Sequence, residues 1–339
     1  MTTPLSRKTE GSSYRIAILD VDGSITGQEA LRSFYDPIII PARDLHDRLR
    51  YWCDRETLEE LRLRVLEHVP SMAGTILLYG SSDFHNLSYL WISMLEEPVS
   101  ILHFDNHTDW VKVPPREAIH AGSWVRHAMD LEHVAKVVQL GVNGDLEMQL
   151  MPPTPTGPLT HDFDLFDTGR LETFPHALRQ ATYFGAVKVP EVCGRSRTGV
   201  LTTRVDWRTI RDEGIETILD EALDRLPTEA VYISIDKDVL RDADCFTNFY
   251  GWQQGTLSLD EVVNALERIG RRKRIVAVDV NGDASPARFT GDGWTGKRLF
   301  SIKDRKLKSE MFEDPRLNAL NAVSNLRILG ALTGVRHAI

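Results

Sequence analysis

The segment VSILHFDNHTDW, residues 99–110, decides the fold of this chain. Residues 99–104 form an almost continuous apolar run, which is typical of a parallel strand covered on both faces. Asp105, His107 and Asp109 follow directly. Because alternate residues of an extended chain project to one side, these three side chains are expected to converge at the carboxyl end of the strand.

The same alternation of apolar runs and amphipathic stretches continues along the chain. Further strands are predicted over residues 14–20, 75–79, 134–141, 182–187, 230–235 and 274–280. Helices are predicted over 56–68, 87–95, 215–226, 258–269 and 314–329, with a Ser258/Glu261 capping box at one start and Gly330 as a stop. This order predicts a three-layer α/β/α fold with a doubly wound, mainly parallel sheet.

The chain is expected to form one domain over residues 14–339, after a flexible polar tail over residues 1–13. Residues 152–173 are rich in proline and have no clean period. We therefore predict a long surface loop there.

Composition excludes several classes of protein. The 339 residues include 40 Lys and Arg against 49 Asp and Glu, a net charge of -9, which disfavours binding to nucleic-acid phosphates. No run reaches the roughly 18 apolar residues of a membrane span, and the N-terminus lacks an apolar targeting segment. The 3 cysteines form no CxxC pair. These features predict a cytoplasmic protein that binds neither nucleic acid nor membranes.

Two more segments place ligand-type side chains after apolar strands. SIDKDVL, residues 234–240, carries Asp236 and Asp238, and two carboxylates aimed at one point repel unless a cation lies between them. GSSDFHN, residues 80–86, carries His85. In an open parallel sheet, ligands bind outside the carboxyl ends of the strands.

Together these segments predict a dinuclear metal site. The candidate ligands are too many for one tetrahedral ion and suit two divalent ions with shared carboxylates. All are oxygen or nitrogen donors, which favours Mn²⁺ over structural zinc. The candidates are His85, Asp105, His107, Asp109, Asp236 and Asp238. His103 lies one pleat deeper in the strand and is expected to support these ligands rather than join them.

In order and placement, GSSDFH, DNHTD and SIDKD resemble the motifs of the ureohydrolases, the family of arginase, agmatinase and formiminoglutamase. The resemblance spans residues 75–286 and implies an arginase-like fold and a homo-oligomer. It also implies that His85, Asp105, Asp109 and Asp236 hold one ion, whereas Asp105, His107, Asp236 and Asp238 hold the other.

The resemblance further implies the chemistry, which is hydrolysis of a C–N bond in a small guanidino or amidino compound by a metal-bridging hydroxide. Asp109 would orient the hydroxide, and His120 would deliver a proton to the leaving amine. The family's substrate-binding glutamate is absent from DVNGDASP, residues 279–286, so Asp283 or Asp279 is expected to replace it. The residues after DNHTD also depart from arginase, which implies a different substrate.

Two alternatives remain open. AILDVDGSITGQ, residues 17–28, resembles the motif of Mg²⁺-dependent haloacid-dehalogenase phosphatases, with Asp20 as nucleophile and Asp22 as acid/base, and residues 290–297 echo their magnesium segment. A turn at Asp22-Gly23 is the simpler explanation of the first segment, and a phosphatase leaves the two Asp-rich motifs unexplained. The second alternative is a non-catalytic binding protein on the same fold.

Overall fold

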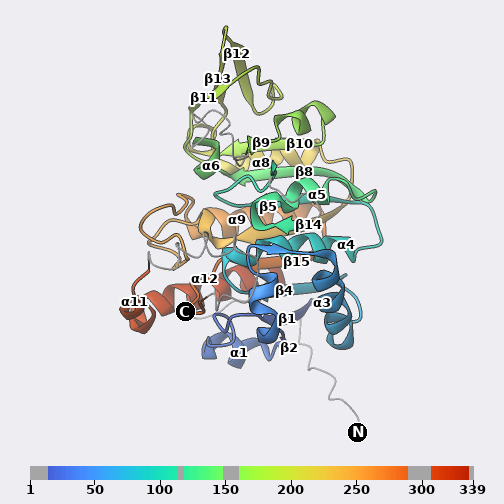
Figure 1. Ribbon diagram of the computed structural model, residues 1–339, viewed down its shortest axis with the longest axis vertical. Coiled ribbons are helices and arrows are strands. Elements are labelled where there is room, and N and C mark those ends of the chain that lie inside the picture. Colours follow the sequence, from blue (N-terminus) through green and yellow to red (C-terminus); the bar gives the residue numbers. More distant parts are fainter. Residues whose placement is uncertain (1–13, 113–117, 148–159, 289–306, 336–339) are drawn as a thin grey trace.

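The computed structural model describes residues 14–112, 118–147, 160–288 and 307–335. Its centre is an eight-stranded sheet in which every neighbouring pair is parallel (Figure 1). The strand order is β10-β8-β5-β14-β15-β4-β1-β2. These strands are β1 (Arg15–Asp20), β2 (Ile38–Pro41), β4 (Thr75–Tyr79), β5 (Val99–Phe104), β8 (Val134–Gly141), β10 (Leu171–Pro175), β14 (Ala230–Asp236) and β15 (Arg274–Asn281).

Helices cover both faces of this sheet, as expected for strands whose residues are almost all buried. In Figure 1, α9 and α12 lie on one side of the sheet, and α3 and α4 lie on the other. The three-layer α/β/α prediction is therefore confirmed. The helices are α1 (Glu29–Tyr35), α2 (His46–Leu49), α3 (Arg55–His68), α4 (Ser88–Ser93), α5 (Trp124–Ala128), α6 (Gly144–Glu147), α7 (Ile210–Glu213), α8 (Ile215–Asp224), α9 (Leu259–Arg272), α11 (Ser309–Glu313) and α12 (Pro315–Thr333).

Short 3₁₀ helices and two-residue strands complete the described elements. The 3₁₀ helices are η1 (Arg43–Leu45), η2 (Ser82–Leu87), η3 (Ala121–Ser123), η4 (Phe163–Thr168) and η5 (Lys237–Val239). Strands β3 (Trp52–Cys53) and β7 (Ile119–His120) pair with each other, as do β6 (Val111–Lys112) and β9 (Thr160–His161). No helix in the described ranges is long and apolar enough to cross a membrane.

An arm of three antiparallel strands projects beyond the β10 edge of the sheet (Figure 1). It consists of β11 (Gln180–Phe184), β12 (Gly194–Thr198) and β13 (Thr202–Trp207). The prediction of a parallel strand over 182–187 is wrong in sheet and direction. The outer face of β11 is partly exposed, so this strand lacks the two-sided cover of the central ones.

The predicted loop over residues 152–173 is also corrected in part. Leu171–Pro175 forms the edge strand β10, which pairs with β8 and is buried along its whole length. Residues 148–159 lie outside the described ranges, as do the predicted tail over residues 1–13 and residues 290–297 of the phosphatase-like segment.

The predicted helix starts are confirmed, whereas one predicted stop is wrong. Ser258 and Glu261 form the capping box of α9, and Asp314 caps α12. Helix α12 continues through Gly330 to Thr333 and ends where Gly334 adopts a left-handed conformation. Glycine at a helix end is informative only when its backbone turns left-handed, and a sequence does not show which glycine does so.

Candidate metal centre

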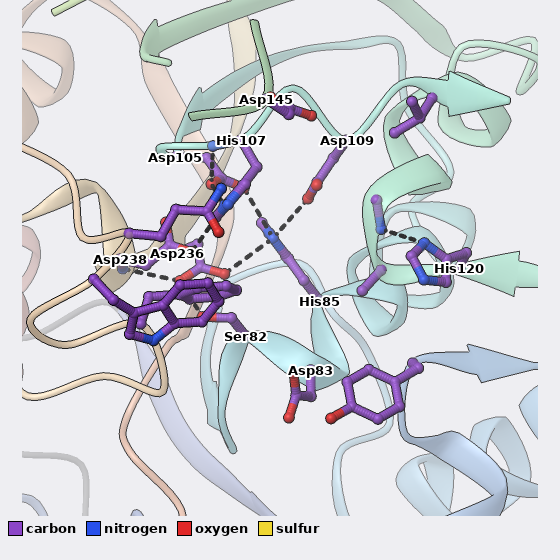
Figure 2. Close-up of a pocket in the computed structure, with 17 residues that line it drawn as sticks. Ser82, Asp83, His85, Asp105, His107, Asp109, His120, Asp145, Asp236 and Asp238 are labelled. Carbon is purple, nitrogen blue, oxygen red and sulfur yellow. Dashed lines mark hydrogen bonds and ion pairs between the residues drawn. The ribbon is translucent and has the colours of Figure 1, made fainter. Parts of the chain in front are cut away.

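A cavity of about 200 Å³ opens at the carboxyl edge of the sheet (Figure 2). His85 reaches it from η2 after β4, the DNHTD residues follow β5, and Asp236 and Asp238 lie at the end of β14 and on η5. The structure thus brings together the predicted ligands His85, Asp105, His107, Asp109, Asp236 and Asp238, and places His120 in the same wall.

His85 is the centre of the first ligand group. Its Nδ1 lies 2.9 Å from Oδ2 of Asp109 and 3.1 Å from Oδ2 of Asp105. Oδ2 of Asp236 is 3.4 Å from the same nitrogen. Asp109 has a left-handed backbone, with φ of 52°, which is rare for a residue other than glycine and is found most often at functional sites.

The second group shares Asp105 with the first. His107 Nδ1 lies 3.0 Å from Oδ2 of Asp238 and 3.4 Å from Oδ1 of Asp105. Ligand atoms of Asp105, His107 and Asp238 lie within 4.8 Å of one another, as do those of His85, His103, Asp105 and Asp109. A carboxylate common to two such groups is the arrangement that a dinuclear site needs.

The pKa shifts in the cluster show strong repulsion among its buried carboxylates. Burial raises the pKa of Asp109 to about 8 and that of Asp238 to about 7. Burial also raises the pKa of Asp236 well above its usual value, with the charges of Asp238 and Asp105 adding to the effect. Burial opposes protonation of His85 and His107, yet the surrounding carboxylates raise the pKa of both rings well above the usual value.

The residues fit a pair of divalent ions. Oδ2 of Asp238 is buried, and the described neighbour that approaches it is Nδ1 of His107 at 3.0 Å, which is itself a candidate metal ligand. Several carboxylates buried this close together are costly unless cations balance their charge. The donors are carboxylate and imidazole, which suit manganese and similar ions.

His103 belongs to the first group by distance, but its hydrogen bonds give it another role. Gln139 receives a hydrogen bond from Trp110 Nε1 at 2.6 Å, which identifies the accepting atom as Oε1. Its Nε2 therefore donates to His103 Nδ1 at 2.8 Å, and the proton of His103 lies on Nε2. That nitrogen is 3.0 Å from Oδ2 of Asp105, so His103 donates to a ligand.

Asp279 is linked to the candidate ligand His85 through hydrogen bonds of Ser234. His85 Nε2 lies 3.0 Å from Ser234 Oγ, which in turn donates to Oδ1 of Asp279 at 3.0 Å. The hydroxyls of Tyr79 and Tyr232 donate to the same carboxylate. Asp279 is fully buried and does not line the cavity, so the substrate role predicted for it is not supported.

The structure also contradicts the prediction that Asp283 holds a substrate cation. Its Oδ2 pairs with Lys237 Nζ at 2.8 Å, and its Oδ1 accepts from Gln28 Nε2 at 3.0 Å. Both members of the ion pair are 0% exposed, and Asp283 does not line the cavity. Lys237, adjacent in sequence to a ligand, had no apparent partner in the sequence, so the pairing could not be foreseen.

Gly282 lies in DVNGDASP, the segment in which a substrate-binding side chain is expected. Its backbone is left-handed, with φ of 99°, and a Cβ there would lie 2.5 Å from Oδ1 of Asp236 and 2.6 Å from the amide nitrogen of Lys237. The end of β15 therefore approaches a candidate ligand too closely for any side chain. A glutamate at this position would therefore not fit the chain as it is folded.

The two carboxylates of the phosphatase-like segment do not line the cavity, and their bonds stabilise the chain around them. Asp20 pairs with Arg43 at 2.7 Å and accepts from Thr26. Asp22 accepts from the amide of Ser24, as in an Asx-turn, and from that of Ser81. Neither residue lines the cavity that holds the ligand groups.

Several residues that line the cavity are not among the predicted site residues. Asp145 follows β8 and aims at the cavity, and Asp83 pairs there with Arg50 at 2.7 Å. Phe249 and Trp252 provide an aromatic side. Residues directly after parallel strands often bind ligands. Asp145 follows β8 in this way, so its place in the cavity could have been predicted from the sequence.

Comparisons with known proteins agree with this geometry. Residues 180–289 match the model of the arginase family. The chain is 25% identical over 274 residues to an uncharacterised protein of Thermotoga maritima, a match that covers 81% of this chain and 82% of that protein.

Among solved structures, arginase from Bacillus subtilis has a TM-score of 0.57 at 13% identity, over 95% of this chain and 99% of its own. The agmatine ureohydrolase of Thermoplasma volcanium has a TM-score of 0.53 at 13% identity, over 96% and 92%. Proclavaminate amidino hydrolase from Streptomyces clavuligerus has a TM-score of 0.52 at 15% identity, over 95% and 93%. The arginase-like fold and the predicted resemblance to the ureohydrolase family are confirmed.

Proposed function

Starting from an arginase-like fold and the match of residues 180–289 to the arginase family, we propose that this protein is a metal-dependent hydrolase. It cleaves a C–N bond of a small guanidino or amidino compound. The observation that carries the proposal is the pair of ligand groups that share Asp105 at the base of the cavity. The departures from arginase around this cavity favour a substrate other than free arginine.

Two Mn²⁺ ions are the proposed cofactor. His85, Asp105, Asp109 and Asp236 would hold one ion, and Asp105, His107, Asp236 and Asp238 would hold the other. Bound there, divalent ions would acidify a water molecule and stabilise the negative charge that develops during hydrolysis.

Asp109 orients the attacking water in this proposal. Trp124 Nε1 donates to its Oδ2 at 2.7 Å, which fixes the carboxylate relative to His85. The other oxygen of Asp109 can accept a proton from water. The left-handed backbone of Asp109 turns the chain so that this carboxylate faces His85 rather than solvent.

His120 is the proposed proton donor to the leaving amine. Its Nδ1 accepts a hydrogen bond from the amide of Gly122 at 2.8 Å, so the neutral ring carries its proton on Nε2. Trp52 packs against the ring, with centroids 4.1 Å apart, and holds its orientation. We further propose that the protein works as a cytoplasmic homo-oligomer, in keeping with the family resemblance.

The test is a turnover screen on the Mn²⁺-loaded protein with a panel of guanidino and amidino compounds, in which release of urea, amine or ammonia is measured. Asp236→Ala should abolish both metal binding and turnover. Asp20→Ala is the matched control, because it also removes a carboxylate at a strand end but lies outside the cavity, and it should retain activity.

Other outcomes would redirect the assignment. Phosphate-ester turnover that is lost in Asp20→Ala with metal retained would favour the phosphatase. Metal binding without turnover of any compound would favour a binding protein on this fold.

A further inference from the structure

The cavity wall holds one carboxylate that the metal assignment does not use. Asp145 lies on α6, directly after β8, and its side chain is 17% exposed and lines the cavity. Figure 2 shows it on the same side of the cavity as His107 and Asp109.

Asp145 differs from the other acidic residues that line the cavity in the described ranges, because each of the others already has a role. Four of the others are the assigned metal ligands. Asp83 is neutralised by a buried ion pair with Arg50, in which both Nε and Nη2 donate to Oδ2. Asp145 has an imidazole beside it, since Nε2 of His161 lies 3.5 Å from its Oδ2, but it has no arginine or lysine partner among the described residues. It can therefore direct negative charge toward a bound molecule once the ions balance the ligand carboxylates.

Asp145 is held in a fixed position relative to the metal motif. The amide of Thr108 donates to its Oδ1 at 3.0 Å, and the Thr108 hydroxyl donates to its Oδ2 at 2.7 Å. Thr108 stands between His107 and Asp109 in DNHTD, so the carboxylate and the ligand groups are parts of one rigid unit. An ionised carboxylate has about four acceptor positions, and these bonds occupy only some of them.

We infer that Asp145 binds the cationic guanidino or amidino group of the substrate, in place of the glutamate for which Gly282 leaves no room. The inference rests on the proposed function. A planar delocalised cation suits a carboxylate that offers both oxygens, and it also suits aromatic faces. Phe249 and Trp252, with ring centroids 5.3 Å apart, supply such faces in the same cavity. The substrate class is accordingly a compact planar cation.

The test compares a planar cation with its neutral counterpart of the same shape. Benzamidinium and benzamide are titrated by calorimetry into the Mn²⁺-loaded protein, into Asp145→Asn and into Glu147→Gln. The last variant is the matched control, because it neutralises an exposed carboxylate on the same helix that does not line the cavity.

Wild type and Glu147→Gln should bind benzamidinium more tightly than benzamide. Asp145→Asn should lose about ten- to a hundredfold of its affinity for benzamidinium and none for benzamide, since one charge-assisted contact is removed. Metal content and melting temperature should stay unchanged, and Asp145→Glu should recover part of the preference.

Two results would overturn the inference, namely a wild-type protein with no preference for the cation, or an Asp145→Asn variant that keeps it. Neither depends on turnover. A preference without hydrolysis would therefore count against the proposed function and leave the role of Asp145 intact.

Discussion

At the scale of single residues, the hydrogen bonds around His103 separate a ligand from a supporting group. Because Gln139 donates to Nδ1 of His103, the nitrogen that faces Asp105 carries a proton and cannot bind a metal. His103→Ala should therefore keep about two ions per chain at saturating Mn²⁺ but weaken their binding about ten- to a hundredfold. Metal titration followed by mass spectrometry measures both quantities. Loss of one ion at saturation would show that His103 is itself a ligand.

Competition between protons and metal ions for the ligand cluster sets a second prediction at this scale. Burial raises the pKa of Asp109 to about 8 and of Asp238 to about 7, so Asp109 is mostly protonated and Asp238 about half protonated at neutral pH. A metal ion must displace these protons, and its apparent affinity should rise with pH through this range. Calorimetry of Mn²⁺ binding in two buffers of different ionisation enthalpy should detect proton release, and an affinity independent of pH would contradict this electrostatic description.

At the scale of elements, the buried central strands of the described sheet could be predicted from the sequence, whereas strands at its edges could not be predicted as well. The predicted limits of β4, β5 and β8 are those observed, because these strands are buried on both faces and read as continuous apolar runs. Strand β2 begins with three isoleucines but is not among the predicted strands, because an apolar run of four residues is too short to distinguish a strand from a loop. Asp283 was misassigned because its partner Lys237 lies on another element, and a sequence does not show long-range ion pairs.

Helix α9 offers a test of local stability that is separate from the metal centre. Ser258 caps it, and Glu261 completes the reciprocal pair of hydrogen bonds. Ser258→Ala should lower the free energy of unfolding by about 1 kcal/mol. Urea unfolding followed by circular dichroism measures the loss. Asp260→Ala, on the same turn but without a part in the capping box, should change stability less, and an equal loss would contradict the capping account.

At the scale of the whole molecule, the order of the strands ties distant segments together. β15 pairs with both β14 and β4, and β1 pairs with β4, so the N-terminal and C-terminal parts of the sheet share one set of hydrogen bonds. We therefore expect one cooperative thermal transition, which Mn²⁺ moves to higher temperature because the ions bind only the folded chain. Scanning calorimetry with and without Mn²⁺ tests this, and two separate transitions would contradict a single cooperative unit.

The central claim is that the carboxyl edge of the sheet holds two metal ions with Asp105 between them. The most direct measurement is the metal content of the purified protein after reconstitution with Mn²⁺, determined by mass spectrometry for wild type and Asp105→Ala. We expect about two ions per chain in the wild type and less than one in the variant, because a shared ligand serves both positions. A wild type that binds a single ion or none, or an Asp105→Ala variant that still binds two, would contradict the account.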